Sequence, residues 1–260
     1  MKSYKTGALI LVAIALVFSG LAVARQNSTD TAATKIYVAN GTEATITGVI
    51  NFEGEVPRPR TIDTSADPDC ETKGGLKTEG WVVKAGKVAN TMIYIKGGGP
   101  LDEYTFPQPD SIARLAHQGC RYEPHALGIR TGQTLMIDNQ DVTVHNSHAT
   151  PRNNPEWNQS HASGVPVSIS FSQPEPLLRF KDNQHPWEGA WVGVFSHPFF
   201  AVSDKLGSYT IKGLPPGRYT LAIAHERYGE KSVEVTVAAY ETKSVDFTLN
   251  YADSLIKTPY

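Results

Sequence analysis

The chain has 260 residues and a formal net charge of −2, and charged residues make up 19% of it. This near-neutral balance, without a basic stripe, argues against nucleic acid as a partner. The length is enough for one or two domains with substantial cores. Gly and Pro are frequent, and Val, Ile, Thr and Tyr gather in short runs, so the composition predicts an all-β protein.

Residues 1–24 are predicted to be a secretory signal peptide. Lys2 and Lys5 precede the apolar run ALILVAIALVFSGLAVA, which ends in Ala22-Val23-Ala24 and predicts cleavage after Ala24. No Cys follows the run, which argues against a lipoprotein anchor. The alternative is an uncleaved anchor, because the run has about the minimum length for spanning a bilayer. We expect a periplasmic or secreted protein with no membrane span after signal removal.

Residues 25–42 are small and polar without an apolar period, so they predict a flexible leader. Alternation and turn residues then predict strands within four segments: TEATITGVINF, WVVKAGKVANTMIYIKGG, IARLAHQGCRYEPHALGI and TGQTLMIDNQDVTVHNSHA. Residues 150–164 are rich in Asn, Pro and Ser and predict a long loop. Further strands are predicted in VPVSISFS, PLLRFKD, AWVGVF and PFFAVSD. Such short, regularly spaced strands favour a Greek-key sandwich.

The last sixty residues differ in their sequence pattern from the preceding part. They predict a compact meander with a tight turn at Pro215-Pro216-Gly217. Alternation in TLAIAHE, VEVTV and VDFTL predicts one buried face for each strand. We therefore expect one unit over 43–198, a second over 199–251 and a C-terminal tail over 252–260.

Cys70 and Cys120 are the two cysteines of the chain. In an exported protein they are expected to form a disulfide, which closes a loop of about fifty residues and contributes roughly 3–4 kcal/mol. Metal ligation is the weaker alternative, because the two residues lie far apart and neither belongs to a C-x-x-C motif.

Copper sites in β-sandwiches combine two imidazoles with a thiolate and a weak axial thioether. One His comes from an early strand, and the other three ligands come from a late loop. Here His145 lies in the early segment DVTVHN, and His185 lies in the late stretch FKDNQHPWEGAWVG. These two histidines are the candidate imidazole ligands.

Several segments together resemble exported bacterial proteins that join a cupredoxin-like domain to a carboxypeptidase-regulatory-like (transthyretin-like) β-sandwich. They are ADPDC, GCRYEPHALGIRTGQTLMIDNQDVTVHNSHA and HPWEGAWVGVFSHPFFAVSDKLGSYTIKGLPPGRYTLAIAHERYG. The resemblance covers nearly all of the mature chain. It implies an all-β protein with a cupredoxin-like Greek-key sandwich followed by a small transthyretin-like sandwich.

In that family the late loop typically reads Phe-Lys-Cys-Asp-Val-His-Pro-Trp-Met. Asp182 stands at the Cys position and Glu188 at the Met position, while His145 and His185 match the two histidines. The loss of both sulfur ligands argues against type 1 copper and fast electron transfer. The four residues predict a harder nitrogen and oxygen site for Cu(II), Zn(II) or another divalent ion. A decayed site that binds no metal is the alternative.

The remaining histidines are weaker candidates. His148 follows His145 by three positions, so in a strand the two side chains point to opposite faces. His161 lies in the polar loop and is a weak candidate ligand. The others are expected to be structural: His117, His125, His197 and His225.

The chain contains no G-x-S-x-G, P-loop or dinucleotide motif, and a disulfide leaves no Cys for nucleophilic attack. We therefore expect a binding protein rather than an enzyme. The alternative function is a metal-free carbohydrate-binding or adhesion module of the cell envelope. The partner is unknown, and an envelope protein or a glycan is the class we expect.

Overall fold

The computed structural model describes Met1, residues 35–72 and residues 74–254. The predicted signal peptide, its cleavage site, most of the leader and residues 255–260 lie outside the described residues. None of the described helices has the length and apolar character needed to cross a membrane. The described part is built from β-strands with two short 3-10 helices, η1 (Pro68–Cys70) and η2 (Leu101–Glu103). The all-β prediction is therefore confirmed.

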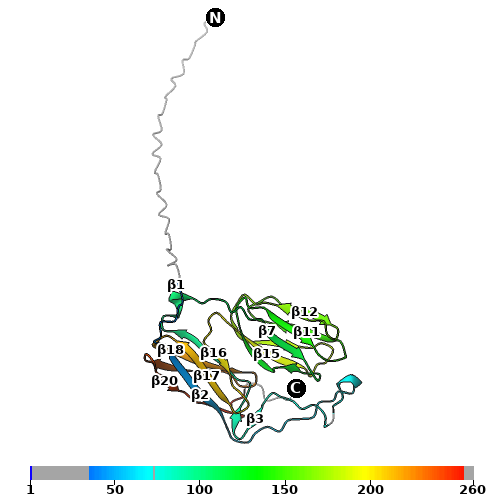
Figure 1. Ribbon diagram of the computed structural model, residues 1–260. Coiled ribbons are helices and arrows are strands. Elements are labelled where there is room, and N and C mark those ends of the chain that lie inside the picture. Colours follow the sequence, from blue (N-terminus) through cyan, green and yellow to red (C-terminus); the bar gives the residue numbers. More distant parts are fainter. Residues whose placement is uncertain (2–34, 73, 255–260) are drawn as a thin grey trace. The chain divides into compact units, whose positions relative to one another are not determined.

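One β-sandwich comes from the middle of the chain and is called the inserted sandwich (green to yellow in Figure 1). Its first sheet has the order β13-β10-β7-β8, with β7 (Ala113–His117), β8 (Tyr122–Glu123), β10 (Leu135–Asn139) and β13 (Val167–Ile169). Its second sheet has the order β12-β11-β14-β15-β9, with β9 (Ala126–Arg130), β11 (His145–Thr150), β12 (Trp157–His161), β14 (Glu175–Lys181) and β15 (Gly189–Phe195).

The inserted sandwich has the predicted cupredoxin-like Greek-key topology. β7 and β10 run parallel, as do β9 and β15, while the other pairs are antiparallel. Alternate residues of the two sheets meet in one apolar core, which includes Leu115, Ile137, Leu178, Phe180 and Val192.

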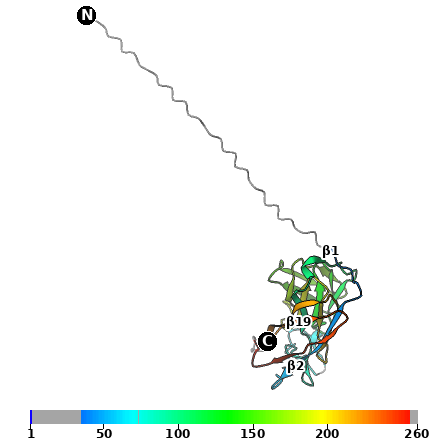
Figure 2. The same ribbon diagram turned by 90° about the vertical axis from the view of Figure 1, so that its left-hand side faces the viewer.

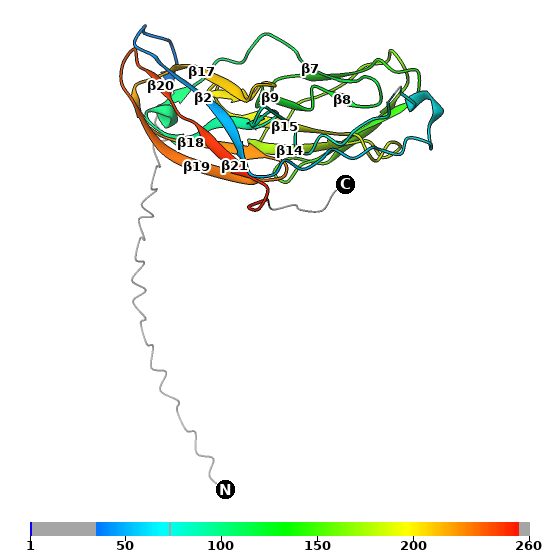
Figure 3. The same ribbon diagram turned by 90° about the horizontal axis from the view of Figure 1, so that it is seen from below.

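The other strands form the flanking sandwich. One sheet has the order β16-β5-β18-β19, with β5 (Met92–Gly98), β16 (Phe200–Val202), β18 (Gly217–His225) and β19 (Gly229–Val237). The other has β2 (Ala44–Glu53) beside β17 (Ser208–Leu214), β4 (Lys87–Val88), β20 (Thr242–Ser244) and β21 (Phe247–Asn250), with β3 (Val83–Lys84) on β4. Figures 2 and 3 show β2, in blue, beside the red C-terminal strand.

The expected boundaries at 43–198 and 199–251 need correction. β2 pairs with β17 and β21, and β5 pairs with β18, so residues 44–98 complete the C-terminal sandwich. The physical reason is burial, because Ile46, Ile50, Ile93 and Ile95 join one core with residues from the last fifty positions. The cupredoxin-like unit is thus inserted between the two parts of the other sandwich.

Three smaller expectations also change. β1 (Lys35–Ile36) of the expected flexible leader pairs with β6 (Tyr104–Thr105). β12 lies inside the expected loop 150–164 and pairs with β11 along its whole length. In β18, residues 221–225 are all buried rather than alternating, because Ala222 and Ala224 pack on Ala126 and Phe195 of the inserted sandwich.

Candidate metal centre

The candidate residues come from one edge of the inserted sandwich. His145 begins β11, Asp182 directly follows β14 and Glu188 directly precedes β15. These three strands are neighbours with alternating direction, so the start of β11, the end of β14 and the start of β15 meet at one edge. The short connection between β14 and β15 carries His185. The fold therefore brings residues 37 to 43 positions apart to one point.

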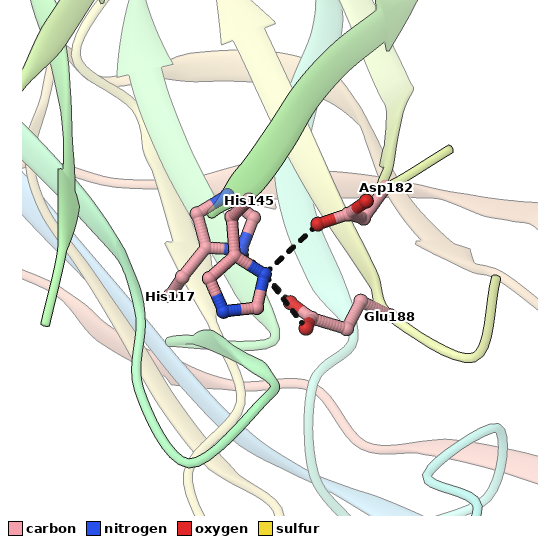
Figure 4. Close-up of side chains that lie close together, drawn as sticks. All are labelled: His117, His145, Asp182 and Glu188. Atoms are coloured by element: carbon pink, nitrogen blue, oxygen red, sulfur yellow. Dashed lines mark hydrogen bonds and ion pairs between the residues drawn. The ribbon is translucent and has the colours of Figure 1, made fainter. Parts of the chain in front are cut away.

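The centre of the cluster is the Nδ1 atom of His145 (Figure 4). It lies 2.9 Å from Asp182 Oδ2 and 3.1 Å from Glu188 Oε1. His185 approaches the same two carboxylates, with its Nδ1 3.2 Å from Asp182 Oδ2 and 3.8 Å from Glu188 Oε1. The side chains of Asp182 and Glu188 are fully buried. The structure thus brings together all four predicted residues.

Asp182 also shapes the loop. Its Oδ1 accepts hydrogen bonds from the backbone N–H groups of Gln184 and His185, at 2.6 and 3.0 Å, as in an Asx turn. Its Oδ2 accepts from the backbone N–H of Asn146 at 3.0 Å. These bonds fix the position of Oδ2 between the two imidazoles.

Glu188 Oε1 accepts no hydrogen bond from the described residues, although it is fully buried. His145 Nδ1 is within ion-pair distance of it, but one ring N–H has one proton to donate and Asp182 is the nearer acceptor. A buried carboxylate oxygen without a donor is costly, so this atom is open to a cation.

Two further carboxylates hold the outer nitrogens of the imidazoles. His145 Nε2 lies 3.1 Å from Asp141 Oδ2, and His185 Nε2 lies 2.9 Å from Asp67 Oδ2. Asp67 comes from the segment before η1, which the Cys70–Cys120 disulfide joins to the inserted sandwich. The predicted disulfide is confirmed. Sequence reasoning missed Asp67 and Asp141 because their closeness to the histidines arises only in the fold.

His117 was expected to be structural, but it lies beside the cluster. Its ring stacks on that of His145 with centroids 4.3 Å apart, and its Nδ1 lies 2.8 Å from Glu188 Oε2. Its ligand atoms and those of His145, Asp182 and Glu188 all lie within 4.8 Å of one another. The position of His117 at the end of β7, on the same edge, explains this closeness.

The other histidines point elsewhere. His148 bonds with Asn183 and Glu156, which agrees with its expected opposite face. His161 reaches the cluster through Ser147, whose hydroxyl lies between it and His117, and through an edge-to-face contact with the His117 ring. His125, His197 and His225 pair with Glu226, with the Ile95 carbonyl and with Trp81, respectively.

The charges of the cluster are strongly coupled. Burial opposes a charge on His145, but hydrogen bonds with Asp141 and Asp182 and the electrostatic effect of Glu188 outweigh it and raise its pKa to about 11. Burial also opposes ionisation of Asp182, yet its bonds with His145, Asn146 and His185 hold its pKa below the ordinary value. Asp182 is therefore ionised at neutral pH and requires positive charge nearby.

Residues 180–250 match the family model described as carboxypeptidase regulatory-like domain, and no curated protein matches the chain. The copper-containing nitrite reductase of Thermus scotoductus SA-01 is 19% identical over 33% of this chain and 22% of that chain, with a TM-score of 0.31. This chain thus spans about a fifth of the reductase.

A purple cupredoxin of Nitrosopumilus maritimus is 21% identical over 32% of this chain and 98% of that chain, with a TM-score of 0.28. An oxidised mutant of amicyanin is 19% identical over 33% of this chain and 84% of that chain, with a TM-score of 0.30. Likenesses this weak carry no argument about function, so the fold class rests on the strand order and register. The chain combines a cupredoxin-like sandwich with a carboxypeptidase regulatory-like domain.

Proposed function

We propose that this is an exported protein that binds one divalent metal ion, Cu(II) or Zn(II), through His145, His185, Asp182 and Glu188. One observation carries the proposal: two imidazoles direct Nδ1 toward the same pair of buried carboxylates. The four nitrogen-to-oxygen distances lie between 2.9 and 3.8 Å. Ligand atoms about 2.0 Å from one tetrahedral ion are separated by about 3.3 Å, so small shifts suffice to enclose an ion.

The negative charge of the buried carboxylates supports the binding of a cation. Buried charges are costly unless they are paired, and the ion-pair partners of Asp182 and Glu188 among the described residues are imidazoles. In the metal-free protein, a proton on the His145 ring supplies positive charge. A divalent ion replaces that proton and also satisfies the unpaired oxygen of Glu188.

The surroundings of the two imidazoles support the same proposal. Metal-bound histidines usually donate the other ring N–H to a carboxylate, which fixes the tautomer and raises ligand basicity. Asp141 and Asp67 occupy these positions on His145 and His185. Both proposed ligands are thus oriented from behind by carboxylates.

We propose a binding role rather than catalysis, because the four ligand residues are almost completely buried. His145, His185, Asp182 and Glu188 are all at most 3% exposed. A catalytic metal keeps an open position for water or substrate, and of these four residues Glu188 alone is among those lining the neighbouring cavity. With nitrogen and oxygen donors the ion supplies charge and structural cross-linking rather than the colour and rapid electron transfer of a copper–thiolate bond.

Titration calorimetry with Zn(II) tests the proposal. Oxidised wild-type protein is expected to bind one ion per chain, and His185→Ala is expected to abolish binding. His197→Ala is a control, because that ring is half-buried and bonds to the Ile95 carbonyl rather than to the cluster. Equal zinc binding by wild type and His185→Ala would contradict the proposal.

A gain-of-function variant tests convergence of the ligands independently. Asp182→Cys with Glu188→Met restores the sulfur ligands at positions already facing both Nδ1 atoms, and is expected to turn intensely blue with Cu(II). Wild-type protein with Cu(II) is expected to stay pale. A folded double variant that binds no copper would show that the histidines do not converge.

Glycan binding is the second candidate, and a cavity of about 380 Å³ favours it. Trp187 and Trp191 line this cavity, and Trp187 Nε1 donates to the Cys120 carbonyl, which fixes the ring. Fixed aromatic faces beside polar groups suit sugar rings. Binding to a glycan array in EDTA, lost in Trp191→Ala but kept in His145→Ala, would support this function instead.

Export remains part of the proposal and rests on the signal sequence and the disulfide. N-terminal sequencing of mature protein is expected to begin at Arg25. An intact N-terminus in the membrane fraction would contradict it.

A further inference from the structure

The Cys70–Cys120 disulfide lies at the outer side of the two histidines. The ligand atoms of Cys70, Asp67 and His185 lie within 4.8 Å of one another, and so do those of Cys120, Asp141 and His145. The sulfur–sulfur bond joins these two groups. Both cysteines are 1% exposed and both histidines are buried, while Asp67 and Asp141 are half-buried.

Hydrogen bonds that do not involve sulfur hold the same groups in place. Asp141 accepts from the backbone N–H groups of Gly119 and Cys120, at 2.6 and 2.9 Å. Asp67 accepts from Asp69 N–H at the start of η1, at 2.9 Å, and from the Thr143 hydroxyl at 2.8 Å. These hydrogen bonds do not depend on the sulfur–sulfur bond, so Asp67, Asp141 and the backbone of Cys120 are expected to stay in place after the disulfide is cleaved.

We propose that reduction of this disulfide creates a second metal site, with the Cys70 and Cys120 thiolates and the Nε2 atoms of His145 and His185 as ligands. The site takes a borderline or soft ion such as Zn(II), because two thiolates and two imidazoles form a typical tetrahedral zinc set. The proposal deepens the proposed function, since it uses the other nitrogens of the same two histidines.

The chemistry needs a dithiol reductant. The dithiol gives two electrons and two protons to the sulfur–sulfur bond, which breaks into two thiols while the dithiol closes to its own disulfide. The metal ion then displaces the two thiol protons, which pass to the solvent, and forms two metal–sulfur bonds. Asp67 and Asp141 stay beside the ion as hydrogen-bond or charge partners.

Cobalt(II) titration tests the proposal, because a cobalt–thiolate bond gives a near-ultraviolet charge-transfer band that nitrogen and oxygen ligands do not give. Protein is reduced with dithiothreitol in denaturant, refolded and freed of reductant without oxygen, and two free thiols are verified. The band is expected to saturate at one cobalt per chain. Oxidised protein and Cys70→Ser/Cys120→Ser are expected to lack it.

Two variants separate this proposal from the first one. Asp182→Asn/Glu188→Gln removes the inner carboxylates, and the reduced variant is expected to keep the band even if its oxidised form binds no metal. Cys70→Ser leaves one free thiol without any reduction and is expected to give about half of the band. Refolded wild type with two free thiols but no band, or no band in folded Cys70→Ser, would overturn the proposal.

Discussion

His145 and His225 are both buried, at 0% and 2% exposure, but their surroundings differ completely. His145 lies among Asp141, Asp182 and Glu188, which raise its pKa to about 11 against the effect of burial. His225 stacks on Trp81 with centroids 4.5 Å apart, and burial lowers its pKa to about 4. Burial of a histidine alone therefore marks no site, whereas convergence of carboxylates on both ring nitrogens does.

The largest expected effect comes from removing the charge partner of His145. Asp182→Ala leaves a buried imidazolium and several backbone N–H groups without an acceptor, so metal-free protein is expected to lose about 3–5 kcal/mol of unfolding free energy. Urea unfolding in EDTA measures it. Asp182→Asn keeps an acceptor for the backbone and is the matched control, with a smaller loss. A change below about 1 kcal/mol in Asp182→Ala would break the comparison.

Acid is expected to destabilise the folded protein through protonation of His225. Its pKa in the folded protein is about 4, below the ordinary 6.5. The neutral ring therefore contributes fully to the unfolding free energy above pH 6.5, and this contribution is lost as pH falls toward 4. The loss approaches about 3 kcal/mol. His145 has the opposite sign in metal-free protein: its contribution is complete below pH 6.5 and is lost as pH rises toward 11.

Unfolding free energies measured in EDTA across this pH range test both signs. His225→Leu is expected to flatten the acid side alone. His145→Leu is expected to flatten the alkaline side and also to change the acid side, because Asp182 and Asp141 lose a partner that lowers their pKa values. If both variants changed the slope of unfolding free energy against pH in the same way, the two histidines would not have the opposite pKa shifts described here.

Asp67 and Asp141, which bond to the outer nitrogens of the imidazoles, are expected to have a smaller effect, on zinc affinity. Asp67→Asn and Asp141→Asn keep the shape of the side chain but weaken its hold on the imidazole, so zinc affinity is expected to fall 10–100-fold, or about 1.4–2.7 kcal/mol. Titration calorimetry measures this effect. Asp246→Asn serves as control, because Asp246 accepts from Val49 in the flanking sandwich. If both variants bound zinc as tightly as wild type, Asp67 and Asp141 would not orient the two imidazoles for metal binding.

The smallest expected effect is at an exposed ion pair. Arg218 and Glu234 are 3.3 Å apart, with side chains 74% and 54% exposed. Arg218→Ala is expected to change the unfolding free energy by at most about 0.5 kcal/mol, because solvent screens the pair. Thermal unfolding checks this value, and a loss comparable to that of Asp182→Ala would show that burial does not separate the two pairs.

The sequence predicted the fold class because local alternation and turn residues mark the strands. The family resemblance singled out Asp182, His185 and Glu188 on one contiguous loop, together with His145 on an earlier strand. The sequence did not predict the insertion, since pairing of β2 with β17 joins residues about 160 positions apart and leaves no local pattern. It missed Asp67 and His117 for the same reason, because each reaches the cluster from a different segment of the chain. Asp141 lies only four positions before His145, and its contact with Nε2 depends on the conformation of the turn before β11.

The central claim is that His145, His185, Asp182 and Glu188 enclose one ion in the oxidised protein. The X-ray absorption spectrum of zinc-loaded, dialysed protein tests it most directly. We predict a first shell of nitrogen and oxygen at about 2.0 Å, containing two imidazoles and no sulfur. Zinc lost on dialysis, or a first shell without two imidazoles, would contradict the claim.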